Sequence, residues 1–170
     1  LERFPKLYED WERMAYGLIV TEAVEHLWPE EEQQPEVYDF LLTFFQALEH
    51  RSPRITAGAA LWQILDFAGF RVDFTSCVGC GERISEGKMS IEDGGLIGSC
   101  CGEFLENEKV PPSAVEALVK IQNYQWYSEW ATDKIRGKDL VIAERILLEY
   151  LNYYLERPLK SVSFLEKMKK

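Results

Sequence analysis

The sequence predicts a mainly α protein, a helical bundle into which one Cys- and Gly-rich hairpin is inserted. Two observations lead to this prediction. Apolar residues recur at helical spacing on both sides of the segment 70–112. The segment itself contains all four cysteines and seven of the eleven glycines. With 170 residues, 46% of them hydrophobic, the chain suits one globular domain, and wholesale disorder is excluded.

Three helices are expected before this segment. The first covers about 7–27, and Pro29 and the polar connector 30–34 follow it. The second begins with Pro35, which is tolerated in a first turn, and continues to about residue 48. The third covers about 54–67, and Gly69 stands where a C-terminal cap is expected.

Helices are also expected after the segment. Ser113 and Glu116 have the spacing of a capping box, which predicts a helix from Ser113 toward Tyr124. A long helix is expected over about 139–155, with Gly137 breaking the pattern before it. A short final helix is expected to begin near Ser163.

The four cysteines form two pairs. Cys77 and Cys80 are separated by two residues, so that both thiolates can reach one metal ion. Cys100 and Cys101 are adjacent and follow after 19 residues. A hairpin is expected between the pairs, with its turn at 92–95. This layout is typical of a zinc ribbon, so the fold prediction becomes a helical bundle with an inserted zinc-ribbon-like hairpin.

Three interpretations of the cysteines stay open. The first is one structural zinc ion on all four, a closed site that folds a loop and does no chemistry. The second is zinc on three cysteines with another ligand, or a hairpin that has lost its metal and packs around cysteines and a disulfide. The third is a redox Cys-x-x-Cys pair, against which the absence of a βαβ pattern argues.

No catalytic constellation is visible in the sequence. His26 and His50 fall near helix C-termini, where an imidazole interacts well with the helix dipole. A nucleophile elbow, a phosphate loop and a His-Glu metal signature are all absent from the sequence. No apolar run approaches the ~20 residues that span a bilayer, and no secretory signal precedes residue 20. We therefore expect neither an enzyme nor a membrane protein.

Charge is distributed unevenly along a chain whose net charge is −10, a balance that argues against a broad nucleic-acid grip by this chain alone. Residues 1–50 carry 3 basic and 12 acidic residues, whereas residues 137–170 carry 7 basic and 5 acidic ones. An acidic partner is therefore expected at the C-terminal end, where Arg145, Arg157 and Lys160 are candidates. The alternative interpretation is that these basic residues only form a solvated face of the last long helix.

The segment 124–130 contains four aromatic residues, followed by Lys134, Arg136 and Lys138. This composition fits a stacking platform or a partner groove. It also fits a helix end that packs over the bundle, which we favour because few basic residues interleave with the aromatic ones.

Three stretches of the chain resemble the C-terminal part of the RecO family of bacterial DNA repair proteins. They are the run 65–73 leading into Cys77–Cys80, the Gly-Gly-Leu-Ile run 94–97, and the segment 150–165. Their order and spacing, with helices on either side, extend the resemblance over nearly the whole chain. The chain opens with Leu1 rather than Met, and we expect it to be a piece of a longer protein.

The resemblance implies a RecO-like C-terminal helical domain over 1–170 with a zinc-finger-like insertion at 70–112. The N-terminal OB-fold of the family is absent from this chain. One structural zinc ion is implied on Cys77, Cys80, Cys100 and Cys101. The chain departs from the family's pattern at Gly98, which stands where the third cysteine is expected, so Cys100 would serve from a shifted position.

The resemblance also implies a function. RecO-like proteins are non-enzymatic mediators of DNA recombination and repair after DNA damage, in the RecF pathway. With RecR they load RecA onto single-stranded DNA coated by single-strand-binding protein, and they anneal strands. The helical part is where the acidic, hydrophobic tail of single-strand-binding protein docks, here hypothetically at Arg145, Arg157 or Lys160, whereas single-stranded DNA is bound mainly through the OB-fold. The implied location is the bacterial cytoplasm, at the nucleoid.

Two other functions are weighed against the mediator. One is an unrelated zinc-stabilised protein-interaction module that shares only the ribbon. The other is a thiol redox protein that uses Cys77 and Cys80.

Overall fold

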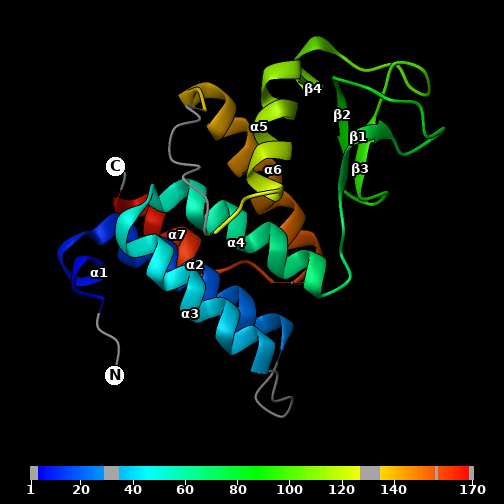
Figure 1. Cartoon of the computed structure of the whole chain (residues 1–170). Coiled ribbons are helices and arrows are strands. Elements are labelled where there is room, and N and C mark those ends of the chain that lie inside the picture. Colours follow the sequence, from blue (N-terminus) through cyan, green and yellow to red (C-terminus); the bar gives the residue numbers. More distant parts are fainter. Residues whose placement is uncertain (1–3, 29–34, 127–134, 156, 169–170) are drawn as a thin grey trace.

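The mainly α prediction is confirmed by the computed structural model, which describes residues 4–28, 35–126, 135–155 and 157–168 (Figure 1). Seven α-helices surround one core in this part of the chain, and a small sheet lies at one end (Figure 1). The helices are α1 (Pro5–Glu9), α2 (Trp11–Leu27), α3 (Pro35–His50), α4 (Pro53–Phe67), α5 (Pro112–Gln122), α6 (Gly137–Tyr154) and α7 (Lys160–Met168). None of these described helices combines the length and apolar character needed to cross a bilayer.

Helix α4 lies at the centre of the bundle and contacts α2, α3, α5 and α6 (Figure 1). Small residues in its first half let neighbouring helices approach closely. Ala57 is fully buried, and a Cβ atom on Gly58 would lie 3.4 Å from Ile121. Eight of its 15 residues are buried, and the exposed residues Asp66 and Phe67 lie in its last turn, so most of α4 belongs to the core.

The C-terminus of α4 forms the glycine cap that the sequence predicts. Gly69 has a φ of +88°, which favours glycine because it has no Cβ atom. The N–H of Phe70 donates to the carbonyl of Leu65 at 2.8 Å, and the N–H of Gly69 donates to that of Asp66 at 3.0 Å. This Schellman arrangement ends the helix and turns the chain into the sheet.

The segment 70–112 forms a four-stranded sheet in the order β1-β3-β2-β4. Its strands are β1 (Asp73–Cys77), β2 (Gly87–Ser90), β3 (Gly95–Ile97) and β4 (Lys109–Val110), with a short 3₁₀ turn η1 (Glu106–Glu108) before the last. The expected hairpin is present, because β2 and β3 pair antiparallel with Met89 opposite Leu96. Its turn, 91–94, begins one residue earlier than expected. The sequence did not predict β1, which pairs with β3 in parallel.

The sheet shares the core of the helical bundle. Phe74 of β1 is 1% exposed, and its ring meets the ring of Trp62 edge-on at a centroid distance of 5.2 Å. Trp62 also contacts Tyr150 of α6 at 5.6 Å. Gln122, at the end of α5, donates to the carbonyl of Val72 at 2.8 Å. The sheet is therefore held against α4, α5 and α6 by buried aromatic contacts.

The single helix expected over 7–27 is wrong, because Asp10 divides it into α1 and α2. The carboxylate of Asp10 accepts the N–H of Glu12 at 3.0 Å and that of Arg13 at 3.4 Å. These bonds make Asp10 the N-cap of α2, and its backbone is extended rather than helical. The apolar spacing continues through the break, which is why periodicity alone does not show it.

The capping box expected at Ser113 and Glu116 is also wrong. Helix α5 begins at Pro112 with Pro111 as its N-cap, so Ser113 already lies inside the first turn. The hydroxyl of Ser113 donates instead to Asp139 at 2.9 Å. Asp139 is 2% exposed, and this bond ties the start of α5 to the start of α6.

Other boundaries move outward from the expected ones. Helix α6 begins at Gly137, two residues before the expected start, and α7 begins at Lys160 rather than Ser163. The polar connector 30–34, the residues 127–130 of the aromatic segment, and Lys134 lie outside the described residues.

The described part of the aromatic segment packs over the bundle. Tyr124 is 5% exposed. The indole N–H of Trp126 donates to Gln63 at 2.7 Å, and its ring meets that of Phe40 at 5.7 Å. For these residues the packing interpretation is confirmed.

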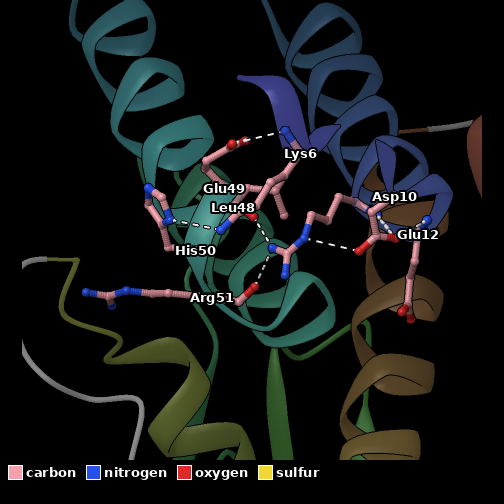
Figure 2. Close-up of polar contacts among 8 residues, drawn as sticks. Lys6, Asp10, Glu12, Leu48, Glu49, His50 and Arg51 are labelled. Carbon is pink, nitrogen blue, oxygen red and sulfur yellow. Dashed lines mark hydrogen bonds and ion pairs between the residues drawn. The ribbon is translucent and has the colours of Figure 1, made fainter. Parts of the chain in front are cut away.

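Polar contacts hold α1 and α2 to the end of α3. Figure 2 shows the carboxylate of Glu49 accepting the N–H of Lys6 at 3.0 Å, and the Lys6 ammonium donating to Nδ1 of His50 at 3.4 Å. The guanidinium of Arg13 donates to the carbonyls of Leu48 and Arg51, at the C-terminus of α3. A cation at this end is favourable because it meets the negative end of the helix dipole.

Helix α7 is anchored to α2 by hydrogen bonds to a single carboxylate, that of Glu22. Glu22 accepts the backbone N–H groups of Lys160 and Ser161, each at 2.9 Å, and the hydroxyl of Ser161 at 2.5 Å. Burial alone would raise the pKa of Glu22, but these bonds and the charge of His26 outweigh it and hold the pKa below its ordinary value. Glu22 therefore acts as the N-cap of a helix that lies 138 residues away in sequence.

We expect Glu22→Gln to lower the free energy of unfolding by about 1 kcal/mol at pH 7, because an amide is a weaker cap than a carboxylate. The contribution of a group with a lowered pKa is present above its unfolded value and is lost as the pH falls through its folded value. The difference between wild type and Glu22→Gln should therefore shrink below about pH 4. Urea titrations at several pH values measure it. Glu25→Gln, an exposed position on the same helix, is the control, and an equal loss there would contradict the prediction.

Candidate metal centre

The sheet topology brings the two cysteine pairs together. Cys77 ends β1, and Cys80 lies in the tight turn that follows, where the N–H of Gly81 donates to the carbonyl of Cys77 at 2.7 Å. Cys100 and Cys101 lie in the turn that follows β3, closed by the N–H of Cys101 on the carbonyl of Gly98 at 3.0 Å. Because β1 and β3 are parallel neighbours, both strands end on the same side of the sheet, and the two turns that follow them lie close together.

The four sulfur atoms all lie within 4.8 Å of one another, and those of Cys80 and Cys100 are 3.4 Å apart. Zinc bound tetrahedrally at about 2.3 Å from each sulfur requires sulfur–sulfur distances of about 3.8 Å. The observed spacing brackets that value, so the four residues fit one zinc ion as ligands. When bound, such an ion would tie the two turns together.

Cys77 is the buried member of the cluster, at 2% exposure. The N–H of Gly98 donates to its sulfur at 3.3 Å. This bond, with help from the N–H groups of Gly79 and Cys80, lowers the pKa of the Cys77 thiol to about 6. Cys77 is therefore prepared as a thiolate, the form that binds a metal ion.

The other pair holds its protons more tightly. A hydrogen bond with Cys80 raises the pKa of Cys100 to about 12, and the same partner raises that of Cys101 to about 11. The physical reason is that a thiol close to a thiolate shares its proton and resists adding a second negative charge. A divalent cation among the four sulfurs would remove this penalty.

Glycine at two positions makes room for the unusual adjacent pair. A Cβ atom on Gly98 would lie 2.8 Å from Ile84 and 3.1 Å from the sulfur of Cys100. A Cβ atom on Gly79 would lie 3.0 Å from Cys101. Gly98 thus contributes an N–H group to the sulfur of Cys77, and its missing side chain leaves room for Cys100. This role of Gly98 was not predicted, and a glycine at the position expected for the third cysteine was its signal.

The surroundings bear on the three interpretations of the cysteines. All four are free thiols, and three of them, Cys80, Cys100 and Cys101, are exposed. No described helix begins at the Cys77–Cys80 turn, whereas redox pairs of this spacing use a helix N-terminus to stabilise the thiolate. The arrangement favours a structural four-sulfur site, and the zinc itself stays a prediction.

The basic residues predicted to meet a partner are not brought into one cluster. Arg145 lies on α6 with its side chain 59% exposed, and it forms an ion pair with Glu149 at 4.0 Å. Arg157 and Lys160 lie together at the connection from α6 to α7, and both are exposed. The nine residues from Arg145 to the end of α6 rise about 14 Å, so Arg145 is distant from the other two.

Comparison with known proteins identifies relatives over almost the whole chain. A family model described as "Recombination protein O C terminal" matches residues 8–163. The chain is 27% identical over 174 residues to the DNA repair protein RecO of Desulforudis audaxviator, covering 99% of this chain and 68% of that protein.

Two further relatives give the same picture. The DNA repair protein RecO of a Nocardioides species is 30% identical over 169 residues, covering 93% of this chain and 66% of that protein. The DNA repair protein RecO of Bacillus pumilus is 25% identical over 174 residues, and the match covers 99% of this chain and 66% of that protein. The chain therefore spans about two thirds of the length of these curated relatives.

We expect the purified protein to bind one zinc ion per chain, and Cys77→Ser to abolish this binding and lower the Tm, because Cys77 is both a ligand and a buried acceptor. Metal analysis and calorimetry measure the two effects. Cys100→Ser and Cys101→Ser should each weaken binding if four sulfurs hold the ion. Ser99→Ala, an exposed neighbour, is the control. Full binding by Cys100→Ser or Cys101→Ser would leave a three-sulfur site instead.

Zinc binding should release at least two protons at pH 7 to 8, since the pKa values of Cys100 and Cys101 are about 12 and 11 in the metal-free protein. The apparent affinity should then fall at least about a hundredfold for each unit by which the pH is lowered. Titration in weak buffer with a pH indicator counts the protons. Release of fewer than two would mean that one of these thiols is not a ligand.

Proposed function

The chain belongs to the RecO family of DNA repair proteins, and from this membership we propose that it acts in DNA repair as part of a non-enzymatic recombination mediator. The observation that carries the proposal is the match to the family model over residues 8–163, which includes both the helices and the cysteine-bearing sheet. The alternative of an unrelated zinc-stabilised module is wrong. Such a module would resemble the family only in the cysteine-bearing segment, whereas the match covers residues 8–163.

The proposed activity is that of the full-length mediator. With RecR it loads RecA onto single-stranded DNA coated by single-strand-binding protein, and it anneals complementary strands. This chain contributes mainly protein contacts, and its net charge of −10 supports that division of work. Its cysteine cluster is proposed to hold one structural zinc ion that stabilises the sheet.

The acidic, hydrophobic tail of single-strand-binding protein is proposed to bind at the C-terminal helix. On α7, Lys160, Phe164 and Lys167 follow one another at the spacing of one helix face, and all three are exposed. Phe164 is 40% exposed, which leaves an aromatic ring available between two ammonium groups. This face offers the apolar and cationic groups that such a tail requires.

Two arginines could extend the binding surface beyond α7. Arg157 is exposed just before the helix. Arg145 has one ion pair at the long distance of 4.0 Å, on a surface where such a pair contributes little, so a stronger acidic partner can displace it. The distance of about 14 Å from Arg145 to the end of α6 corresponds to about four residues of extended peptide.

We expect a labelled tail peptide of single-strand-binding protein to bind this chain saturably, with an affinity that weakens as salt is added. Lys160→Ala and Arg145→Ala should each raise the Kd about two- to fivefold, the usual effect of one exposed charge pair. Phe164→Ala should raise it at both low and moderate salt, because its contribution is apolar. Fluorescence anisotropy at the two salt concentrations measures all three.

Arg83→Ala is the matched control, because Arg83 is an exposed arginine on the sheet, away from α6 and α7. Absence of saturable binding by the folded, zinc-loaded chain would contradict tail docking on this domain. Binding that none of the variants affects would show that the tail uses another surface.

A further inference from the structure

The cysteine cluster differs from a regular zinc ribbon in the spacing of its second pair, and this spacing restricts how the cluster can be oxidised. In a ribbon with two Cys-x-x-Cys turns, each turn can close a disulfide of its own. Here Cys100 and Cys101 are adjacent. Neighbouring Cα atoms lie about 3.8 Å apart, whereas a disulfide requires about 4.4 to 6.8 Å. These two thiols therefore do not join each other without distortion of the backbone.

The four thiols also differ in their access to solvent. Cys77 is 2% exposed, and its sulfur accepts the N–H of Gly98 at 3.3 Å, so it is held inside the sheet. The three other cysteines are exposed. Because an oxidant reaches exposed sulfurs first, the reacting pair comes from these three. With a bond between Cys100 and Cys101 excluded, one member of the pair is Cys80.

Cys80 meets Cys100 across the gap between the two turns. Their sulfur atoms are 3.4 Å apart, so closure to the 2.05 Å of a disulfide bond needs a movement of about 1.4 Å. Both residues lie in turns and not within a strand, so this movement breaks no strand pairing. The parallel pairing of β1 with β3, which brings the turns together, is left intact.

We propose that Cys80 and Cys100 are a site of reversible oxidation, at which a peroxide replaces the zinc ion by a disulfide that joins the same two turns. The proposal goes beyond the structural zinc site proposed above and rests on it for the ion that is released. The disulfide itself does not depend on that site, because the two sulfurs already lie close together in the metal-free protein.

The reaction balances with one molecule of hydrogen peroxide. One of the two sulfurs attacks an oxygen of the peroxide, the O–O bond breaks, and a sulfenic acid forms. The other sulfur attacks the sulfenic sulfur, so that the S–S bond forms and the S–O bond breaks. Each departing hydroxide takes a proton from solvent and becomes water, and each sulfur gives up one electron. Cys77 and Cys101 are left as two ligands, fewer than a structural zinc site requires, so they would release the ion.

This exchange should keep the sheet folded. A disulfide between Cys80 and Cys100 closes a loop that has 19 residues between its ends and contains β2 and β3. The ion and the disulfide both tie the turn after β1 to the turn after β3, so either restrains the same part of the unfolded chain. Oxidation should therefore remove the metal without unfolding the sheet, and a thiol reductant with zinc should reverse it.

Trypsin provides an assay of the pairing, because it cleaves between the two cysteine pairs after Arg83 and Lys88. The first pair lies on peptide 72–83 and the second on peptide 89–109. The zinc-loaded protein is treated with hydrogen peroxide, zinc release is followed with a colorimetric chelator, and the unreduced digest is analysed by mass spectrometry. We expect one zinc ion to be released for each cross-link between the two peptides, an unchanged circular dichroism spectrum, and recovery with dithiothreitol and zinc.

Serine variants of the metal-free protein test the pairing without the ion. Cys100→Ser should slow the cross-linking of the two peptides several-fold. Cys101→Ser is the matched control, since it removes the adjacent exposed thiol and should leave the rate unchanged. Fragmentation of the cross-linked peptides should assign the bond to Cys80 and Cys100. Equal rates in the two variants would overturn the assignment.

A disulfide within peptide 72–83 would also overturn the proposal, as would a disulfide between two chains or oxidation to sulfinic acid without a cross-link. Unfolding of the sheet on oxidation would contradict the exchange. A purified protein that binds no zinc would overturn the zinc site and with it the exchange, whereas the metal-free variants would still decide the disulfide. A zinc-loaded protein that forms no cross-link would overturn this proposal alone.

Discussion

The burial of most of α4 at the centre of the bundle is the constraint on which the rest of the structure depends. Its small residues allow α2, α3, α5 and α6 to pack against one helix, and its large residue, Trp62, carries the contact onward to Phe74 of the sheet. A bulkier residue at Gly58 would push against Ile121, so the close approach of α5 depends on the absence of a side chain there. The bundle and the sheet thus have one core rather than two.

This shared core also positions the cysteines. Phe74 fixes β1 against Trp62, and the parallel pairing of β1 with β3 then sets the two cysteine turns side by side. Cys77 faces inward and receives the N–H of Gly98, whereas the other three thiols face solvent. A bound ion would join the buried Cys77 to the three exposed cysteines. Its contribution would therefore be to hold the sheet together and not to reaction chemistry.

The two ends of the chain have opposite surface chemistry. The first helices are acidic and expose a contiguous apolar groove, whereas α7 exposes lysines around an aromatic ring. Glu22 joins these regions physically, because a carboxylate on α2 caps the N-terminus of α7. The acidic, grooved end of the bundle and the basic end are therefore joined directly by one side-chain cap.

Local patterns in the sequence were enough to predict the helical class, the cap at Gly69, the hairpin and the four cysteines as one group. Each depends on spacing between nearby residues, which periodicity and turn chemistry record. The break at Asp10, the start of α5 and the parallel strand β1 were decided only in three dimensions. Asp10 competes with a continuous apolar pattern, Ser113 finds a better partner in Asp139, and β1 pairs with residues about twenty positions away. Likewise, the sequence by itself determined which thiols are present, but only the packing of Gly79 and Gly98 against the adjacent pair decided that all four could meet, because that depends on the space left by absent side chains.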